Sequence, residues 1–244
     1  MSQLTDEQKS NRWGNFTSSG IGDLMTNAKK AGELSSKALQ YIAERNMERR
    51  LGRGLGHDAT SYATSWGHLV EQVAFDAITS LGYKLCSDET VKHTKINCWM
   101  GSPDGYGDDK ETVFDIKCPW TMKSFCQLAD CKTPADLLNA NDFSYKYYWQ
   151  LVSNAILTKS KYAELIVYCP YRDELDAIRE RAKTLGDHEY QFVTYATDYK
   201  LPYLNRGGHY KNLNILRWEV SEADKSALTA RVIEASEKLI PRTA

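Results

Sequence analysis

The spacing of apolar residues predicts helices and strands in alternation along the chain. Six stretches carry the three- to four-residue apolar spacing typical of helices: 19–30, 33–51, 60–80, 121–158 (a group of helices), 173–185 and 221–239. Five other segments are strand-like: 95–101, 112–118, 165–169, 192–196 and 214–220. This order of elements predicts an α/β domain with a central mixed β-sheet flanked by helices.

Composition narrows the class of protein. The 244 residues suit one domain, and no repeat, low-complexity tract or linker divides residues 1–244. With 42% hydrophobic and 26% charged residues, the chain reads as soluble and globular. The start, MSQLTDEQKSNRW, is not a signal peptide, and no apolar run approaches the roughly 20 residues of a membrane span. We therefore expect a cytoplasmic protein with no membrane partner.

The charge balance limits how this chain could bind nucleic acid. The formal net charge is −1, so no overall positive field would attract DNA. A DNA partner would need local positive charge or charge supplied by a bound metal. The six cysteines form no CxxC pair, which favours free buried thiols over a metal cluster or disulfides.

The segment GSPDGYGDDKETVFDIKCPW, residues 101–120, concentrates charged side chains beside a predicted strand. Side chains alternate along a strand, so Asp115 and Lys117 share one face of VFDIKC. Asp104 follows a proline just after the preceding strand. A hairpin-like return across 105–111 would bring Asp104 beside Asp115. The sequence therefore predicts two neighbouring carboxylates with a lysine next to them.

Two such carboxylates would repel each other unless a cation lay between them. Oxygen ligands suit magnesium or manganese. The lysine is no ligand while charged, but it can orient or help deprotonate a water and offset charge on a phosphate. A polar hairpin tip with an ordinary Asp–Lys pair on a solvated strand face is the alternative.

Several motifs resemble a known family. The order Ser-Pro-Asp-Gly (102–105), then Asp-x-Lys (115–117), resembles the core of the PD-(D/E)XK (restriction-endonuclease-like) nucleases. KCPWT (117–121) is similar to the YqaJ-like viral recombinase and bacteriophage lambda exonuclease branch. Three further pieces match in the same order, over about residues 11–170: RWGNFTSSGIGDLM (12–25), GHLVE (67–71) and YYWQLVSNAILT (147–158).

The resemblance implies a set of catalytic roles. Asp104 and Asp115 would be metal ligands, with the Ile116 carbonyl sharing a metal and Glu71 completing the site for two ions of magnesium or manganese. Lys117 would position the attacking water. This chain has Asp115 where the lambda enzyme has glutamate, and the shorter side chain leaves the metal preference open.

The helices that would carry Glu71 and Gln150 are compatible with these roles. Glu71 lies at the edge of a buried arc, and Gly67, one turn earlier, is expected to permit close backbone approach. That arc consists of Trp66, Leu69, Val70, Val73, Ala74 and Ala77. His68 falls off it and is predicted to be a surface histidine. Gln150 lies opposite an apolar arc, with Lys146 and Asn154 beside it, on a face exposed to solvent or lining a channel. The resemblance implies the channel.

A second site is implied near the N-terminus. By resemblance, Arg12 and Ser19 would bind the terminal 5′-phosphate, which suits a guanidinium, a hydroxyl and the amides of a starting helix. The alternative for Ser18 and Ser19 is a simple helix N-cap. The basic residues Arg49, Arg50 and Arg53 either contact the DNA backbone or form a solvated loop, and the loop 203–209 receives no role.

The resemblance as a whole implies a metal-dependent deoxyribonuclease, a 5′-to-3′ exonuclease that resects double-stranded DNA ends for phage-type recombination. It also implies a homotrimer and a single-strand annealing protein as functional partner. An endonuclease or nickase on the same fold is the second hypothesis. A catalytically degenerate DNA-binding protein is the third, and the intact set of two acids and a lysine argues against it.

Overall fold

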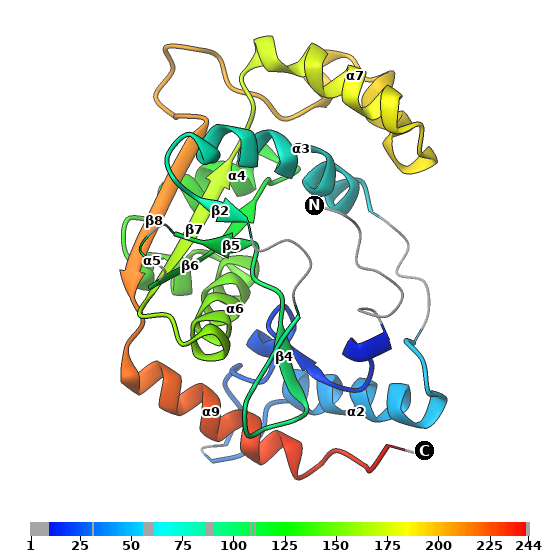
Figure 1. The fold of residues 1–244 in the computed structure, drawn as a ribbon, viewed down its shortest axis with the longest axis vertical. Helices are drawn as coiled ribbons and strands as arrows, with labels where there is room; N and C mark the ends of the chain where they lie inside the picture. The colour runs from blue at the N-terminus through cyan, green and yellow to red at the C-terminus, as the bar shows by residue number, and fades with distance from the viewer. Residues whose placement is uncertain are drawn as a thin grey trace.

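The strands form two sheets in the computed structural model, which describes residues 10–30, 32–55, 61–85, 90–107, 109 and 111–242 (Figure 1). The larger sheet has five strands in the order β2-β5-β6-β7-β8: Lys84–Leu85, Gly105–Tyr106, Thr112–Lys117, Tyr162–Tyr168 and Leu213–Glu219. Strands β6 and β7 are parallel, whereas the other neighbours are antiparallel, so this sheet is mixed. The smaller sheet has the order β1-β4-β3: Phe16–Thr17, Trp99–Gly101 and Val91–Lys92.

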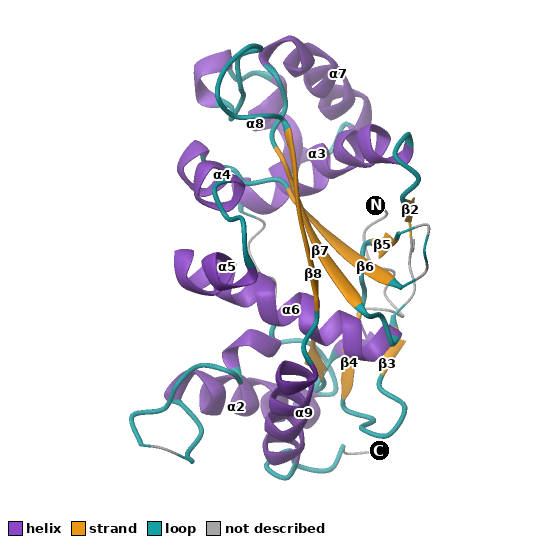
Figure 2. Cartoon of the chain, turned by 90° about the vertical axis from the view of Figure 1, so that its left-hand side faces the viewer, coloured by secondary structure: helices purple, strands orange, loops and turns teal. Residues whose placement is uncertain are grey.

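Helices cover both faces of the larger sheet, as the view along its edge in Figure 2 shows. The α-helices of the described residues are α2 (Ser36–Leu51), α3 (Tyr62–Thr79), α4 (Met122–Ala129), α5 (Pro134–Ala140), α6 (Asp142–Thr158), α7 (Leu175–Leu185), α8 (Gln191–Thr194) and α9 (Glu222–Ser236). Of these, α2 and α9 lie beyond the larger sheet (Figure 1). Because side chains alternate, Val113 of β6 packs in the core beneath α6, whereas Phe114 and Ile116 pack in the core shared with α3 and α7. The predicted α/β class is confirmed.

Most predicted elements are confirmed, but the strand predicted at 192–196 is wrong. Residues 191–194 form the short helix α8, between the 3₁₀ helices η3 (His188–Tyr190) and η4 (Asp198–Lys200). Within this segment Val193 is buried, whereas Tyr195 is 84% exposed. Apolar runs this short occur in both strands and helices, and periodicity alone does not separate them.

Two other predictions need correction. The helix predicted at 19–30 is reduced to the 3₁₀ helix η1 (Ile21–Asp23), followed by turns. The strand predicted at 95–101 begins only at Trp99, because the backbone turns at 95–98. In that turn His93 Nδ1 accepts hydrogen bonds from the N–H groups of Lys95 and Ile96.

The predicted hairpin places Asp104 between the two sheets. Strand β5 pairs antiparallel with β6, with Gly105 opposite Phe114, so continuing this register by one residue puts Asp104 opposite Asp115. Only glycine fits at 105, because a Cβ there would lie 2.2 Å from the Lys84 carbonyl oxygen and 2.4 Å from the Phe114 ring. The two carboxylates are thus brought together by local strand pairing.

Two smaller predictions concern the cysteines and the membrane. Cys98, Cys118, Cys126, Cys131 and Cys169 are free thiols, while Cys86 lies outside the described residues. Across the described ranges, no helix combines the length and the apolar character needed to cross a bilayer.

Candidate active site

A pocket of about 510 Å³ opens where β6 ends between α3 and α6. Its lining includes Glu71, Asp104, Asp115, Ile116, Lys117 and Gln150. Three elements that are distant in sequence therefore bring all of the predicted catalytic and metal-binding residues to one pocket. Arg12 and Ser19 are not among its lining residues.

Asp115 is fixed at the centre of the pocket. It is 1% exposed, and its Oδ1 accepts a hydrogen bond of 2.7 Å from Gln150 Nε2. Its Oδ2 forms an ion pair with Lys117 Nζ. The ammonium of Lys117 also lies 5.0 Å from the centre of the Tyr147 ring, which favours a cation. Both oxygens of Asp115 thus have a polar partner within the pocket.

Asp104 is held against the edge of β6. Its Oδ2 accepts a hydrogen bond of 2.6 Å from the Ile116 N–H. The Asp104 N–H in turn donates to the Phe114 carbonyl. The N–H and C=O of one strand residue point to the same side. The Ile116 carbonyl therefore points to the edge of β6 on which Asp104 lies. A metal ion bound by both groups would lie at this edge.

The pocket holds more negative than positive charge. Burial raises the pKa of Asp104 well above its ordinary value, and repulsion from Asp115 and Glu71 adds to this effect. Burial also raises the pKa of Glu71 to about 7, although Lys117 partly opposes the shift. For Lys117, burial acts to lower the pKa, but the attraction of Asp115 and Asp104 outweighs it and raises the pKa. Lys117 is therefore an ammonium group near neutral pH.

The donor set fits a divalent metal ion by charge and chemistry. Three buried carboxylates face one ammonium, and hard oxygen atoms are the ligands that magnesium and manganese prefer. Among the described residues, however, no group of three or more His, Cys, Asp and Glu side chains already has the arrangement of a metal site. The carboxylates share a pocket without converging on one point, since Ile116, Gln150 and Lys117 engage their oxygens.

Helix α3 forms one wall of the pocket. Glu71 is 8% exposed, and the predicted buried arc is largely found, although Val73 and Ala77 are only half-buried. The close approach expected at Gly67 is not found, because a Cβ there would meet nothing within 4 Å. The open space beside Gly67 belongs to the pocket. His68 is exposed, as predicted, and also lines the pocket.

Helix α6 forms the opposite wall. The structure places Gln150 on the pocket side, half-buried, and not on an open solvent face. Asn154, which the sequence grouped with Gln150, is instead fully buried. Tyr147 was missed by the sequence analysis. Its position three residues before Gln150, on the same helical face, was the signal that could have identified it.

Arg12 and Ser19 lie near Tyr41, outside the pocket. Thr17 Oγ1 is 3.3 Å from Ser19 Oγ and 3.4 Å from the Tyr41 hydroxyl. The Arg12 Nε is buried without a hydrogen-bond partner, and burial lowers the pKa of the guanidinium while Tyr41 opposes that shift. The unpartnered Nε leaves a donor that an anion could use.

The N-cap alternative for the two serines is wrong. Gly20 is the N-cap of η1, and no side chain caps it. Ser18 is 2% exposed and pairs with Ser153 at 2.8 Å, so it is part of the core. Ser19 is exposed and therefore accessible to a ligand.

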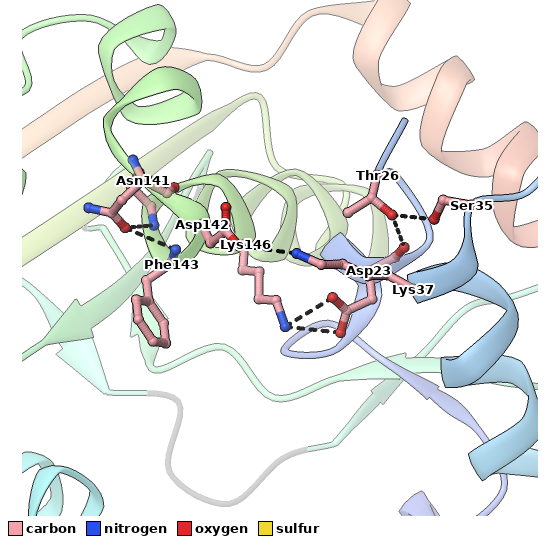
Figure 3. A network of polar contacts seen from close by, with 9 residues as sticks. Asp23, Thr26, Ser35, Lys37, Asn141, Asp142, Phe143 and Lys146 are labelled. Atoms are coloured by element: carbon pink, nitrogen blue, oxygen red, sulfur yellow. Dashed lines mark hydrogen bonds and ion pairs between the residues drawn. The ribbon is translucent and has the colours of Figure 1, made fainter. Parts of the chain in front are cut away.

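Helix α6 contacts η1 through Lys146 and Asp23, as Figure 3 shows. Lys146 Nζ contacts both carboxylate oxygens of Asp23, at 2.9 and 3.0 Å. Gly22 packs against Lys146, since a Cβ at 22 would lie 3.0 Å from the Lys146 Cα. Gln150 follows one turn later, about 6 Å along the helix axis. Helix α6 thus carries Gln150 of the pocket and also contacts η1, the element that follows Ser19 in the chain.

The remaining sequence candidates are placed as follows. Arg49 donates to the carbonyls of Gly14 and Ile240, so it ties the N-terminal segment to the C-terminal tail. Arg50 and Arg53 are exposed. The loop 203–209 packs on residues 170–173, where Leu204 exchanges backbone hydrogen bonds with Pro170 and Arg172.

Comparison with known proteins places the fold. No family model and no curated protein sequence matches the chain. Among solved structures, the alkaline exonuclease LHK-Exo from Laribacter hongkongensis gives a TM-score of 0.61 at 18% identity, covering 96% of this chain and 92% of its own. Its complex with dAMP gives the same TM-score and coverage at 20% identity. A phage-related exonuclease from Haemophilus somnus 129PT gives 0.63 at 15% identity, covering 92% of each chain. The chain has the fold of these exonucleases.

Proposed function

We propose that this protein is a metal-dependent deoxyribonuclease, and specifically an exonuclease that degrades one strand from the ends of duplex DNA in the 5′-to-3′ direction. The observation that carries the proposal is the buried set of Asp104, Asp115 and Lys117, which occupies one pocket on an exonuclease fold. Phosphodiester hydrolysis needs an activated water and a counter-charge for the phosphate, and this set can supply both.

Asp104, Asp115, Glu71 and the Ile116 carbonyl would hold magnesium or manganese. When bound, the metal supplies a polarised water and neutralises negative charge on the phosphate. Gln150 keeps the Asp115 carboxylate in one orientation through its 2.7 Å hydrogen bond. Lys117 would orient the attacking water or help to deprotonate it, and would offset the charge that develops on the phosphate.

The direction of degradation rests on the N-terminal region. Arg12 and Ser19 would bind a terminal 5′-phosphate, which places the end of one strand near η1 while α6 leads to the pocket. The neighbour solved with dAMP has bound a nucleoside monophosphate, the class of product expected here. The family resemblance supports three further parts of this proposal. They are a role in phage-type recombination, a single-strand annealing protein as partner, and a homotrimeric assembly.

The test compares end-labelled linear duplex with covalently closed circular DNA in magnesium. The wild type should degrade the linear substrate and leave the closed circle intact. Lys117→Ala should lower the rate by about 10²–10⁴-fold, which is the usual contribution of a side chain that takes part in proton transfer in the transition state. Lys161→Ala is the matched control, because this lysine is 51% exposed and lies just before β7, at the other end of the sheet from the pocket.

Two results would contradict the proposal. Cleavage of closed circles as readily as linear ends would replace the exonuclease with an endonuclease. Retention of more than about a tenth of the wild-type rate in Lys117→Ala would remove Lys117 from the reaction.

A further inference from the structure

An aromatic cluster borders the pocket on the side away from η1. Trp120 lines the pocket itself, and its ring contacts three others edge to face: Trp66 at 5.6 Å, Phe192 at 5.4 Å and Tyr62 at 6.3 Å between ring centres. Tyr62 stacks on Phe192 at 4.3 Å. Trp66 is buried, whereas Trp120 and Phe192 are half-buried and Tyr62 is 62% exposed. The cluster is thus anchored in the core and continues out to the surface.

Local sequence fixes Trp120 at this position. Strand β6 ends at Lys117, and Pro119 restricts the backbone of the short connection that follows. Thr121 then caps helix α4 by accepting a hydrogen bond from the Ser124 N–H. Trp120 is therefore held three residues beyond Lys117, between a strand end and a helix start. Its exposed surface opens into the same pocket as the Lys117 ammonium.

Space for a planar group lies beside Trp120. Next to Tyr62 and Trp66, which contact Trp120, helix α3 lines the pocket with the small residues Ala63, Thr64 and Gly67, followed by His68. A Cβ at Gly67 would meet nothing within 4 Å, so no side chain of the described protein fills that space. The pocket volume of about 510 Å³ lies within the range of ligand sites, roughly 300–1,000 Å³.

We propose that Trp120, supported by Tyr62 and Phe192, forms a subsite for the nucleobase of the nucleotide being released, with Ala63, Thr64 and Gly67 leaving room for it. The subsite rests on the proposed function, because the proposal assumes that the phosphate of the nucleotide binds beside Lys117. Every base has a π-face, so aromatic stacking holds bases without selecting a sequence. Such a subsite suits an enzyme that removes nucleotides of any identity in turn.

Binding of mononucleotides tests the subsite separately from hydrolysis. In manganese, the affinity of the wild type is measured by calorimetry for dAMP, for dTMP and for 2-deoxyribose 5-phosphate, which lacks a base. We expect both nucleotides to bind about 5- to 150-fold more tightly than the sugar phosphate, the effect of one stacked base. Trp120→Leu should bring this ratio close to one and leave the affinity for the sugar phosphate unchanged.

Three further variants serve as controls. Trp120→Phe should keep most of the ratio, because it keeps an aromatic ring. Tyr199→Ala should keep all of it, since Tyr199 is 78% exposed and lies outside the pocket lining. Tyr62→Ala should reduce the ratio by loosening the support of Trp120, and it decides the matter if Trp120→Leu does not fold.

The outcomes separate the subsite from the nuclease proposal. A wild-type ratio near one, or an unchanged ratio in a folded Trp120→Leu variant, overturns the subsite even if the protein degrades DNA. If the protein degrades no DNA but the ratio is high and depends on Trp120, the subsite stands and the nuclease proposal fails.

Discussion

At the scale of single residues, the main electrostatic feature is the excess of buried carboxylates in the pocket. Asp104 and Asp115 are 6% and 1% exposed, and Lys117 forms an ion pair with Asp115. Without a further cation, this arrangement costs stability, because buried charges are stable only when they are paired. We therefore expect the same carboxylates to destabilise the metal-free protein and to bind the metal.

Replacing either aspartate with asparagine should separate these two effects. Asp104→Asn and Asp115→Asn should each lose manganese binding, since each removes one charge from an ion site that depends on ionised oxygen ligands. In the absence of metal, Asp104→Asn should raise the melting temperature, because asparagine can still accept the hydrogen bond from the Ile116 N–H without a buried charge.

Calorimetry with manganese and thermal unfolding with and without the metal give the two readouts. Asp176→Asn is the matched control, since Asp176 is 94% exposed and lies on α7. The burial of both aspartates already contradicts the solvated hairpin that the sequence left open. Unchanged manganese affinity in both site variants would mean that the buried carboxylates and Lys117 form a structural ion-pair network that holds no metal.

At the scale of elements, the sequence predicted the segments whose pattern is determined locally. The alternation in 112–117 identified β6 and the shared face of Asp115 and Lys117, and Ser-Pro-Asp-Gly identified the hairpin that brings Asp104 to them. The unpredicted features depend on tertiary contacts. Phe192 became helical while packing against Tyr62 and Trp120, and Gly22 is constrained by Lys146 of α6. Contacts between segments that are distant in sequence produce no periodic pattern of apolar residues, so the sequence pattern did not predict them.

Gly67 in helix α3 is a position where stability and activity are expected to change in opposite directions. Alanine is favoured over glycine inside a helix by about 0.8–1 kcal/mol, and a Cβ at 67 would meet no atom within 4 Å. Gly67→Ala should therefore increase the free energy of unfolding by roughly that amount. The new methyl group would enter the pocket, so nuclease activity should fall.

Chemical denaturation and the rate on linear duplex measure the two quantities. Ala74→Gly provides the converse control, because Ala74 is fully buried in the same helix and its loss should destabilise without changing the pocket lining. Full activity in a stabilised Gly67→Ala protein would mean that substrate does not use the space beside residue 67.

At the scale of the whole molecule, the charge balance means that the proposed binding of DNA would depend on a few specific contacts. The net charge of −1 gives no general attraction for a phosphate backbone. The candidate contacts lie at separate places, with Arg12 and Ser19 near Tyr41 and the carboxylate pocket beside Gln150. A DNA strand bound at both places would reach from its terminal 5′-phosphate to the bond that is hydrolysed. The presence of that phosphate should therefore affect the rate of degradation.

This arrangement predicts a strong preference for phosphorylated ends. Wild-type protein should degrade 5′-phosphorylated duplex about 10- to 150-fold faster than 5′-hydroxyl duplex, since a charge-assisted contact contributes roughly 1.5–3 kcal/mol. Arg12→Ala should slow the phosphorylated substrate by that factor and leave the hydroxyl substrate nearly unchanged, because only the former uses the buried guanidinium. Arg50→Ala, at an exposed position, should affect both substrates little. If Arg12→Ala slows both substrates equally, Arg12 supports the fold or general backbone binding and does not recognise the terminal phosphate.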